Sequence, residues 1–285
     1  MSDLCSMKCC VMDKKAEEYV KMAKAYHNRV AEEYDKPECN EALGYDELYN
    51  YITDKIEWHY IEKYLPSKGL VLDAAGGTAR LAIPIAKKGL NVVIIDISEG
   101  MLKIAREKIR EQNLENRITL EQGDIHKIDF PDNHFDFILA QGIEYCPDLE
   151  RVVAELARVL KPQCYLELSA DSLFFVTWAF LNEKNLEKAL QVLEEGKYMD
   201  DDGDVWCWVY TPSQFRDMCH RHNLKVEKIT SGGGVCAYIK DQSFRQAIFQ
   251  NKKQLEKLLK IEMKLCEIED TAILGSHPIL IAKKQ

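Results

Sequence analysis

The sequence lacks any apolar run long enough to cross a membrane. A spanning helix needs about 20 predominantly apolar residues, and no apolar run among the 285 residues approaches that length. Residues 1–15 also lack the apolar core of a secretory signal peptide. We therefore expect a cytoplasmic protein without a membrane partner.

An excess of positive charge is missing as well. The 38 Lys and Arg residues are outnumbered by 47 Asp and Glu residues, which gives a formal net charge of −9. Nucleic-acid binding depends on a basic surface that neutralises phosphates, so we expect no nucleic acid as the main partner. The basic residues of 103–110 fit the solvated face of an amphipathic helix.

Paired-cysteine and metal-binding motifs are absent from the sequence. The 10 cysteines include no CxxC pair, and no HExxH motif occurs, so we expect free thiols in a reducing compartment and no metal site. The cluster of Cys5, Cys9 and Cys10 either belongs to a frayed leader or binds a soft metal or metalloid. The histidines, His27 and His277 among them, are dispersed, which favours surface or core positions over catalysis.

From residue 70 onward, short apolar runs alternate with helical patterns. Strands are predicted at 70–74, 91–96, 117–121, 135–140 and 164–170, and helices at 79–88, 99–112 and 148–160. This alternation predicts right-handed crossovers and a mostly parallel sheet. Apolar strands without strict alternation fit a sheet that is covered on both faces. The predicted fold class is therefore α/β.

Other segments lie outside this alternation. Helices are predicted at 14–35, 45–65, 172–197, 212–222 and 242–268, and strands at 205–210, 224–230 and 279–282. Apolar side chains make one stripe along 242–268, which packs either on the core or on a second subunit in a homodimer. Aromatic residues gather at 174–180, Trp206, Trp208 and Tyr210, where they either line a ligand pocket or form the core of a cap.

The turn after the first predicted strand suits close contact with a ligand. Asp73 lies at the end of that strand, and Gly76 and Gly77 let the backbone approach without a Cβ. Asp96 ends the next strand, where a carboxylate accepts two hydrogen bonds from a ribose. Taken alone, the turn also fits a dinucleotide-binding loop, but it lacks the spacing G-x-G-x-x-G.

Four ordered elements resemble those of class I S-adenosylmethionine-dependent methyltransferases of the small-molecule type. They are the loop from Asp73 to Ala79, Asp96, Gly123-Asp124, and the run from Phe135 to Gly142, and the helix end Arg158-Val159-Leu160-Lys161-Pro162 matches as well. The resemblance covers about 70–170 and is weaker at 205–230 and 272–284. It implies a Rossmann-like sheet of seven strands, mostly parallel with the last antiparallel, and helical N-terminal and inserted cap segments.

The resemblance also implies a division of the chain. Residues 1–65 would form a leader and helical cap, 66–171 the cofactor-binding core, 172–222 an inserted substrate cap, and 223–285 the last core strands with the inserted helix 242–268. S-adenosylmethionine would be the cofactor. Its methyl group would move by in-line displacement to a small-molecule acceptor held under the N-terminal cap and residues 172–210.

The resemblance assigns the cofactor to residues at the ends of the strands. Asp73 would orient the loop or accept from the ammonium group through water, Asp96 would bind the ribose, and Asp124 the adenine amino group. The whole predicted set is Asp73, Ala75, Gly76, Gly77, Asp96, Ile97, Gly123, Asp124, Ile125, Gln141 and Gly142. The sequence departs from the family pattern at Ala75 and Ala79, where glycine is usual.

Three residues are candidates for catalysis near the mouth of the predicted site. Glu144 and Tyr145 follow the fourth strand directly, and Tyr34 ends a helix that resembles one closing over the cofactor. A base is needed only where the acceptor arrives protonated. Simple packing under the cap is the alternative for Tyr145 and for the neighbouring Cys146.

Alternatives to small-molecule methylation remain open. The acceptor atom could be oxygen, nitrogen, carbon, sulfur or a metalloid, and the thiols of Cys5, Cys9 and Cys10 motivate the last. Methylation of a protein or RNA is a second hypothesis. A non-catalytic, cofactor-binding regulatory subunit is a third, which the intact Asp73 and Asp96 disfavour.

Overall fold

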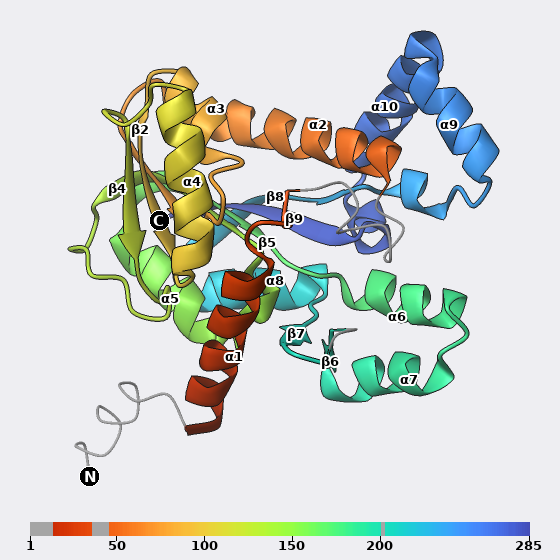
Figure 1. Ribbon diagram of the computed structural model, residues 1–285, viewed down its shortest axis with the longest axis horizontal. Coiled ribbons are helices and arrows are strands. Elements are labelled where there is room, and N and C mark those ends of the chain that lie inside the picture. Colours follow the sequence, from red (N-terminus) through yellow and green to blue (C-terminus); the bar gives the residue numbers. More distant parts are fainter. Residues whose placement is uncertain (1–13, 36–45, 201–202) are drawn as a thin grey trace.

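The computed structural model describes residues 14–35, 46–200 and 203–285. Within these residues, seven strands form one sheet with helices against both faces (Figure 1). In spatial order the strands are β3 (Ile118–Gln122), β2 (Asn91–Asp96), β1 (Leu70–Ala74), β4 (Phe135–Gln141), β5 (Leu160–Ser169), β9 (His277–Lys284) and β8 (Leu224–Gly232). β9 runs antiparallel to both of its neighbours, and the other strands run parallel to one another. The predicted α/β class and the antiparallel last strand are confirmed.

The helices of the described chain mostly begin at a capping side chain. They are α1 (Lys14–Val30), α2 (Glu47–Tyr64), α3 (Ala82–Lys87), α4 (Glu99–Glu111), α5 (Leu149–Val159), α6 (Leu173–Asn182), α7 (Leu186–Glu195), α8 (Pro212–Arg221), α9 (Gln242–Gln250) and α10 (Lys252–Cys266). Ser98, Asp148 and Thr211 each accept from an amide of the first turn of α4, α5 and α8. Such caps satisfy amides that have no partner inside the helix. None of these helices combines the length and apolar character needed to cross a membrane.

The sheet is buried on both faces because successive strand residues point to opposite sides. Val71 and Ile94 belong to an apolar cluster with residues of α3 and α4. Leu72 and Ala74 belong to the cluster on the other face, together with residues of α5 and α8. Residues 212–221, which the expected division assigns to the inserted cap, form α8, and α8 packs on β8 and β9.

Four predicted helices differ from those observed. The helix expected over 14–35 ends at Val30, so Tyr34 lies in the turn after α1 and does not end the helix. The single helix expected over 172–197 is two helices, because Lys184 has a φ of 62° and Asn185 caps α7. The single helix expected over 242–268 is also two, since Asn251 ends α9 and caps α10. The helix expected from residue 79 begins at Ala82, because Ala79 has a left-handed φ of 69°. A helix cannot run through such a residue.

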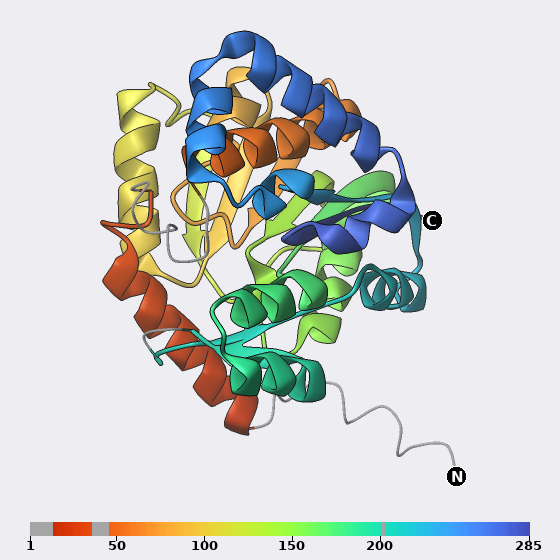
Figure 2. The ribbon, with the colours of Figure 1, turned by 90° about the vertical axis from the view of Figure 1, so that its right-hand side faces the viewer.

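Several helices lie outside the two layers that cover the sheet. α1 lies beside α4, and α6 and α7 lie beneath the sheet with the hairpin of β6 (Lys197–Met199) and β7 (Trp206–Trp208) (Figure 2). α9 and α10 pack on α2. The apolar stripe of α10 joins the same cluster as α2 residues, so it packs within its own chain.

Candidate active site

The strand order changes direction at β1, and a cavity of about 760 Å³ opens there. β1 pairs with β2 on one side and β4 on the other, and ligands of open α/β sheets bind outside the strand ends at such a point. Every residue predicted to bind the cofactor lines this cavity, as do Tyr34, Glu144 and Tyr145. The structure therefore brings the predicted site together.

The loop after β1 approaches the cavity with its backbone. Ala75, Gly77 and Ala79 have φ values of 60°, 50° and 69°. A Cβ on Gly76 would lie 2.7 Å from the Asp73 carboxyl carbon, so the loop crosses closely over Asp73. A Cβ on Gly77 would meet no described atom within 4 Å. The space over Gly77 is thus left open on the cavity side.

Asp73 lies under this loop without full hydrogen bonding. Its side chain is buried, and Oδ2 has no partner in the described structure. Burial raises the pKa of Asp73 to about 7, with Arg80 opposing the shift. A cationic or N–H donor in the cavity would supply the missing bond.

Asp96 is fixed at the end of β2 by two backbone amides. Gly77 N donates to Oδ2 at 2.9 Å, and Ser98 N donates to Oδ1 at 2.8 Å. Burial raises the pKa of Asp96, and these two bonds counteract part of that shift. Each oxygen keeps a second lone pair, so the held carboxylate can accept from the two hydroxyls of a ribose.

Asp124 is held ionised at the far end of the predicted adenosyl site. His126 donates to its Oδ1 from the backbone at 2.9 Å, and the His126 ring lies 2.6 Å from the same oxygen. Burial would raise the pKa of Asp124, but the bonds and charge of His126 lower it below the usual value. Oδ2 is left to accept from a ligand such as an adenine amino group.

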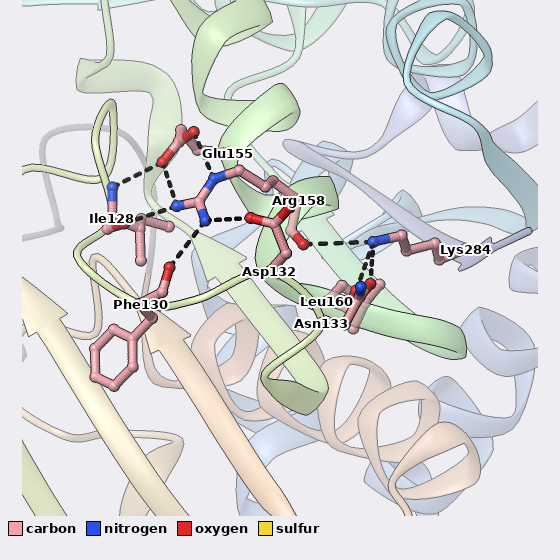
Figure 3. A network of polar contacts seen from close by, with 8 residues as sticks. All are labelled: Ile128, Phe130, Asp132, Asn133, Glu155, Arg158, Leu160 and Lys284. Atoms are coloured by element: carbon pink, nitrogen blue, oxygen red, sulfur yellow. Dashed lines mark hydrogen bonds and ion pairs between the residues drawn. The ribbon is translucent and has the colours of Figure 1, made fainter.

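The segment that carries Asp124 is anchored by α5 (Figure 3). The Arg158 guanidinium donates to the backbone oxygens of Ile128 at 2.7 Å and Phe130 at 2.8 Å, and it pairs with Glu155 and Asp132. Glu155 in turn accepts from Ile128 N at 2.9 Å. This network explains the basic residue of the helix end that the sequence analysis matched: it fixes the loop between β3 and β4.

The other half of the cavity is aromatic and acidic. Glu144, in the short helix Ile143–Tyr145, has a pKa raised to about 8 by burial and by the neighbouring Asp171. Tyr145 contacts the His27 ring at a centroid distance of 4.5 Å and stacks on Tyr26 at 6.0 Å. Burial raises the pKa of Tyr145, so its hydroxyl stays protonated, whereas Tyr34 is 43% exposed.

Several lining residues were missed by the sequence analysis. They include His27, Tyr49, Arg80, Asp171, Tyr198 and His277. Arg80 directly follows the loop after β1, whereas the others lie outside the strand–helix alternation of residues 70–170. His277 Nε2 lies 3.2 Å from Asp171 Oδ1, and Tyr198 donates to Asp171 Oδ2 at 2.7 Å. Both histidines had been assigned to surface or core positions. No local motif marks them, because the fold alone joins their segments.

The aromatic residues of 174–180, Trp206, Trp208 and Tyr210 do not line this cavity, so the pocket interpretation of them is wrong. Val176 and Phe180 form an apolar cluster with α7, and Trp206 and Trp208 pack around Tyr19 of α1. The core interpretation is correct for most of these residues, although Phe174 of α6 is exposed.

Cysteine chemistry receives no support from the described part of the chain. Cys146 lines the cavity, but burial raises the pKa of its thiol well above the usual value. Among the described residues, no group of three metal-ligating side chains is present. Cys5, Cys9 and Cys10 lie outside the described residues.

The residues present fit S-adenosylmethionine. The backbone is open at Gly77 and also at Gly142, where φ is 70° and a Cβ would meet no described atom within 4 Å. Asp73 has a buried oxygen without a partner, and Asp96 presents a positioned carboxylate at the next strand end. Fold and site together define the class I methyltransferase architecture.

Sequence comparison agrees with this class. Residues 71–163 match the family model described as "Methyltransferase domain". A curated relative, a ubiquinone/menaquinone biosynthesis C-methyltransferase from Shewanella piezotolerans, is 33% identical over 153 residues, which cover 52% of this chain and 58% of that protein. The chain thus spans a little over half the length of that relative. The predicted resemblance to the class I S-adenosylmethionine-dependent methyltransferases is confirmed over residues 71–163.

Solved structures share the fold at low identity. A methyltransferase from Thermotoga maritima, described as a "possible histamine N-methyltransferase", has a TM-score of 0.56 at 16% identity and covers 92% of this chain and 99% of its own. The [4+2]-cyclase SpnF has a TM-score of 0.53 at 19% identity and covers 81% of each chain. These likenesses establish the architecture, and the reaction has to be argued from the site.

Proposed function

We propose that this protein transfers a methyl group from S-adenosylmethionine to a small molecule. One observation carries the proposal: a single cavity is lined by every predicted cofactor residue together with Tyr34, Glu144 and Tyr145. The cofactor supplies a methyl carbon on a positively charged sulfur, which is a good leaving group. The protein therefore has to orient the acceptor and exclude water.

Each end of the cavity has its own role in this proposal. Asp96 would hold the ribose and Asp124 the adenine, while Asp73 and the backbone at Gly77 face the amino-acid part. Ile97, Ile125 and the other predicted lining residues would provide walls. Gln141 also lines the cavity, and its amide donates to Glu167 at 3.1 Å.

Helix α1 favours a small acceptor over a protein or an RNA. Asn28 Oδ1 accepts from Ser98 Oγ at 2.8 Å and from Gly100 N at 2.9 Å, and Thr78 donates to Asp35 at 2.9 Å. Residues of α1 also line the cavity. An acceptor must fit inside the covered space, as expected for residues 1–65 and 172–210 acting as a cap.

The first test is calorimetric titration with S-adenosylmethionine, using Asp96→Asn as the variant. The amide keeps the size of the side chain but removes charge-assisted bonds to the ribose, so affinity should fall by about 1.5–3 kcal/mol. Asp217→Asn, a change on α8 away from the cavity lining, is the control and should bind normally. Equal affinity of all three proteins would place the cofactor elsewhere.

The second test is incubation with a methyl-labelled cofactor and an extract of small metabolites, followed by mass spectrometry. A labelled metabolite supports the proposal. Cofactor binding without any labelled product would favour the regulatory-subunit alternative, and labelling of protein or RNA would favour the macromolecular one.

Location and assembly remain predictions. We propose a cytoplasmic protein, which accords with the free state of Cys146, Cys207 and Cys219 and the other described cysteines. A homodimer through 242–268 would have to use outward residues such as Phe244 and Ile261, which are exposed, because α2 covers the stripe of α10.

A further inference from the structure

The acceptor end of the cavity contains a buried carboxyl group with an unused oxygen. Glu144 is 8% exposed, it lines the cavity, and its Oε2 has no partner in the described structure. Leaving a buried carboxyl group unpaired costs free energy. Such a group at a binding cavity indicates that a ligand provides the missing donor.

The groups around Glu144 do not provide that donor. Asp171 repels it electrostatically, and His277, which attracts it, already lies 3.2 Å from Asp171. Ser276 Oγ lies 2.8 Å from the other His277 ring nitrogen. The remaining titratable neighbours are the hydroxyls and thiols of Tyr34, Tyr145, Cys146, Cys207 and Tyr210. None of them is hydrogen-bonded to Oε2 in the described structure.

The basic residues that line the described cavity are already engaged with protein groups. Arg80 donates to Asp54 at 2.7 Å, to Glu57 at 3.0 Å and to Gln141 at 2.9 Å. His126 pairs with Asp124. The pKa of His27 is lowered by burial, and its Nδ1 lies 2.8 Å from Ala23 O. An anionic acceptor would therefore lack a free cation, whereas a cationic acceptor has Glu144.

We propose that the methyl acceptor is a small amine, which enters as an ammonium ion and pairs with Glu144. This inference rests on the proposed function and narrows its acceptor class. The rings of Tyr26, Tyr34 and Tyr145 line the same part of the cavity, and aromatic faces attract cations within about 6 Å. A single buried carboxylate beside aromatic rings selects a positively charged group over a neutral one of similar shape.

Glu144 also provides a base that can deprotonate such an acceptor before methyl transfer. An ammonium ion has no lone pair, so the Glu144 carboxylate takes one N–H proton and leaves the neutral amine. The amine nitrogen then attacks the methyl carbon, the carbon–sulfur bond breaks, and its electron pair remains on sulfur. The product is a methylated ammonium ion, and the proton on Glu144 passes to solvent when the site opens.

The state of Glu144 before binding gives a measurable signature. Burial and Asp171 raise the pKa of Glu144 to about 8, so the carboxyl group is mostly protonated at pH 7. Pairing with an ammonium ion favours the ionised form. Binding of the amine should therefore release a proton from the wild-type protein.

The deciding experiment identifies the methylated atom. Wild-type protein is incubated with methyl-labelled cofactor and a metabolite extract, and the labelled product is fragmented in a mass spectrometer. A methyl group on nitrogen supports the inference. A methyl group on carbon, oxygen or sulfur overturns it and leaves the proposed function intact, whereas the absence of any labelled metabolite contradicts the proposed function itself.

Glu144→Gln then tests the role of the carboxyl group. With the identified amine, kcat/KM should fall by about 100-fold or more, since a general base is worth that much, and the rising limb of its pH profile should disappear. Calorimetry in two buffers of different ionisation enthalpy should show the proton release only for the wild type. The variant should still bind S-adenosylmethionine normally, which separates this effect from misfolding.

Glu262→Gln is the matched control, because Glu262 is also a buried glutamate but does not line the cavity. Its kcat/KM and proton release should equal those of the wild type. If Glu144→Gln turns over the amine as fast as Glu262→Gln at every pH, Glu144 is not the base, and the inference about its role fails.

Discussion

Glu167 is a carboxyl group in the middle of the sheet with no exposed surface. Gln141 donates one hydrogen bond to it, and its second oxygen has no partner in the described structure. Burial raises the pKa of Glu167 to about 8. The folded protein therefore holds this residue neutral at pH values where the unfolded chain ionises it.

This shift predicts how stability depends on pH. Between about pH 4.5 and pH 8 the folded state binds one more proton at Glu167 than the unfolded state, so this contribution is complete at acid pH and is lost as the pH rises. Glu167→Gln removes it. Between about pH 4.5 and pH 8, the free energy of unfolding of the wild type should fall by up to about 1.4 kcal/mol per pH unit relative to that of the variant. Urea unfolding at several pH values measures this difference. If the free energies of unfolding of the two proteins changed with pH in parallel, Glu167 would have an ordinary pKa.

The loop after β1 keeps an unusual backbone conformation at residues that are not all glycine. Alanine stands at two positions of this loop where the family usually has glycine. Ala75, Gly77 and Ala79 all have left-handed φ values. Ala75 and Ala79 thus adopt the left-handed backbone conformation that glycine adopts readily, although neither is a glycine. A left-handed alanine costs about 1–2 kcal/mol, which the rest of the fold has to offset, so a glycine pattern alone would not have found this loop.

At the scale of elements, α5 supports the cofactor site from behind. Arg158 binds backbone oxygens of the loop that carries Asp124, and Lys284 of β9 bonds to Asn133 at 2.8 Å and to Leu160 O at 2.7 Å (Figure 3). The loop has little secondary structure of its own. Its position therefore depends on these side chains.

Arg158→Met should weaken both the fold and the site. The backbone oxygens of Ile128 and Phe130 lose their donor, so the free energy of unfolding should fall by about 2–3 kcal/mol, and affinity for S-adenosylmethionine should fall as well. Urea unfolding and calorimetry measure the two effects. Arg106→Met is the control, since Arg106 makes one exposed ion pair at 3.6 Å and should change stability little. Equal losses in the two variants would argue against the anchoring role.

Element positions were largely predictable, and element ends were not. Apolar runs and helical periods located the strands of the sheet and α4 and α5 within a few residues, because both patterns follow from burial. The breaks at Lys184 and Asn251 were missed. Both residues are polar and fit a helix surface, so a helical period continues through them. The local signals of the breaks are the N-cap side chains of Asn185 and Asn251.

At the scale of the whole molecule, α1 joins the two halves of the site. It carries Tyr26 and His27 into the cavity, and Asn28 ties it to the start of α4. Arg29 also pairs with Asp204 beside β7. We therefore expect a ligand to enter the cavity past this helix.

Asn28→Ala should weaken the attachment of α1 to the start of α4. Without its two hydrogen bonds, α1 should open more often, so S-adenosylmethionine should both associate and dissociate faster, as measured by stopped-flow fluorescence. Lys24→Ala, on the exposed side of the same helix, should leave both rates unchanged. Identical rates for the Asn28 variant and the wild type would mean that the ligand enters by another route.

The sequence predicted the cofactor half of the site far better than the acceptor half. Cofactor residues follow strand ends, and parallel strands deliver their ends to one edge, so local patterns suffice. The acceptor half combines His27, Tyr145, Tyr198 and His277 from four distant segments. Their meeting depends on how α1, the β6–β7 hairpin and β9 pack, which no local pattern encodes.

The place of β9 in the sheet has a consequence for synthesis on the ribosome. β9 lies between β5 and β8, although both of those strands precede it in the sequence. Until residues 277–284 have been synthesised, β8 has no sheet neighbour among the described strands, and the edge of β5 is bare. The nascent chain must therefore keep two open strand edges from pairing with other molecules until translation delivers His277–Lys284.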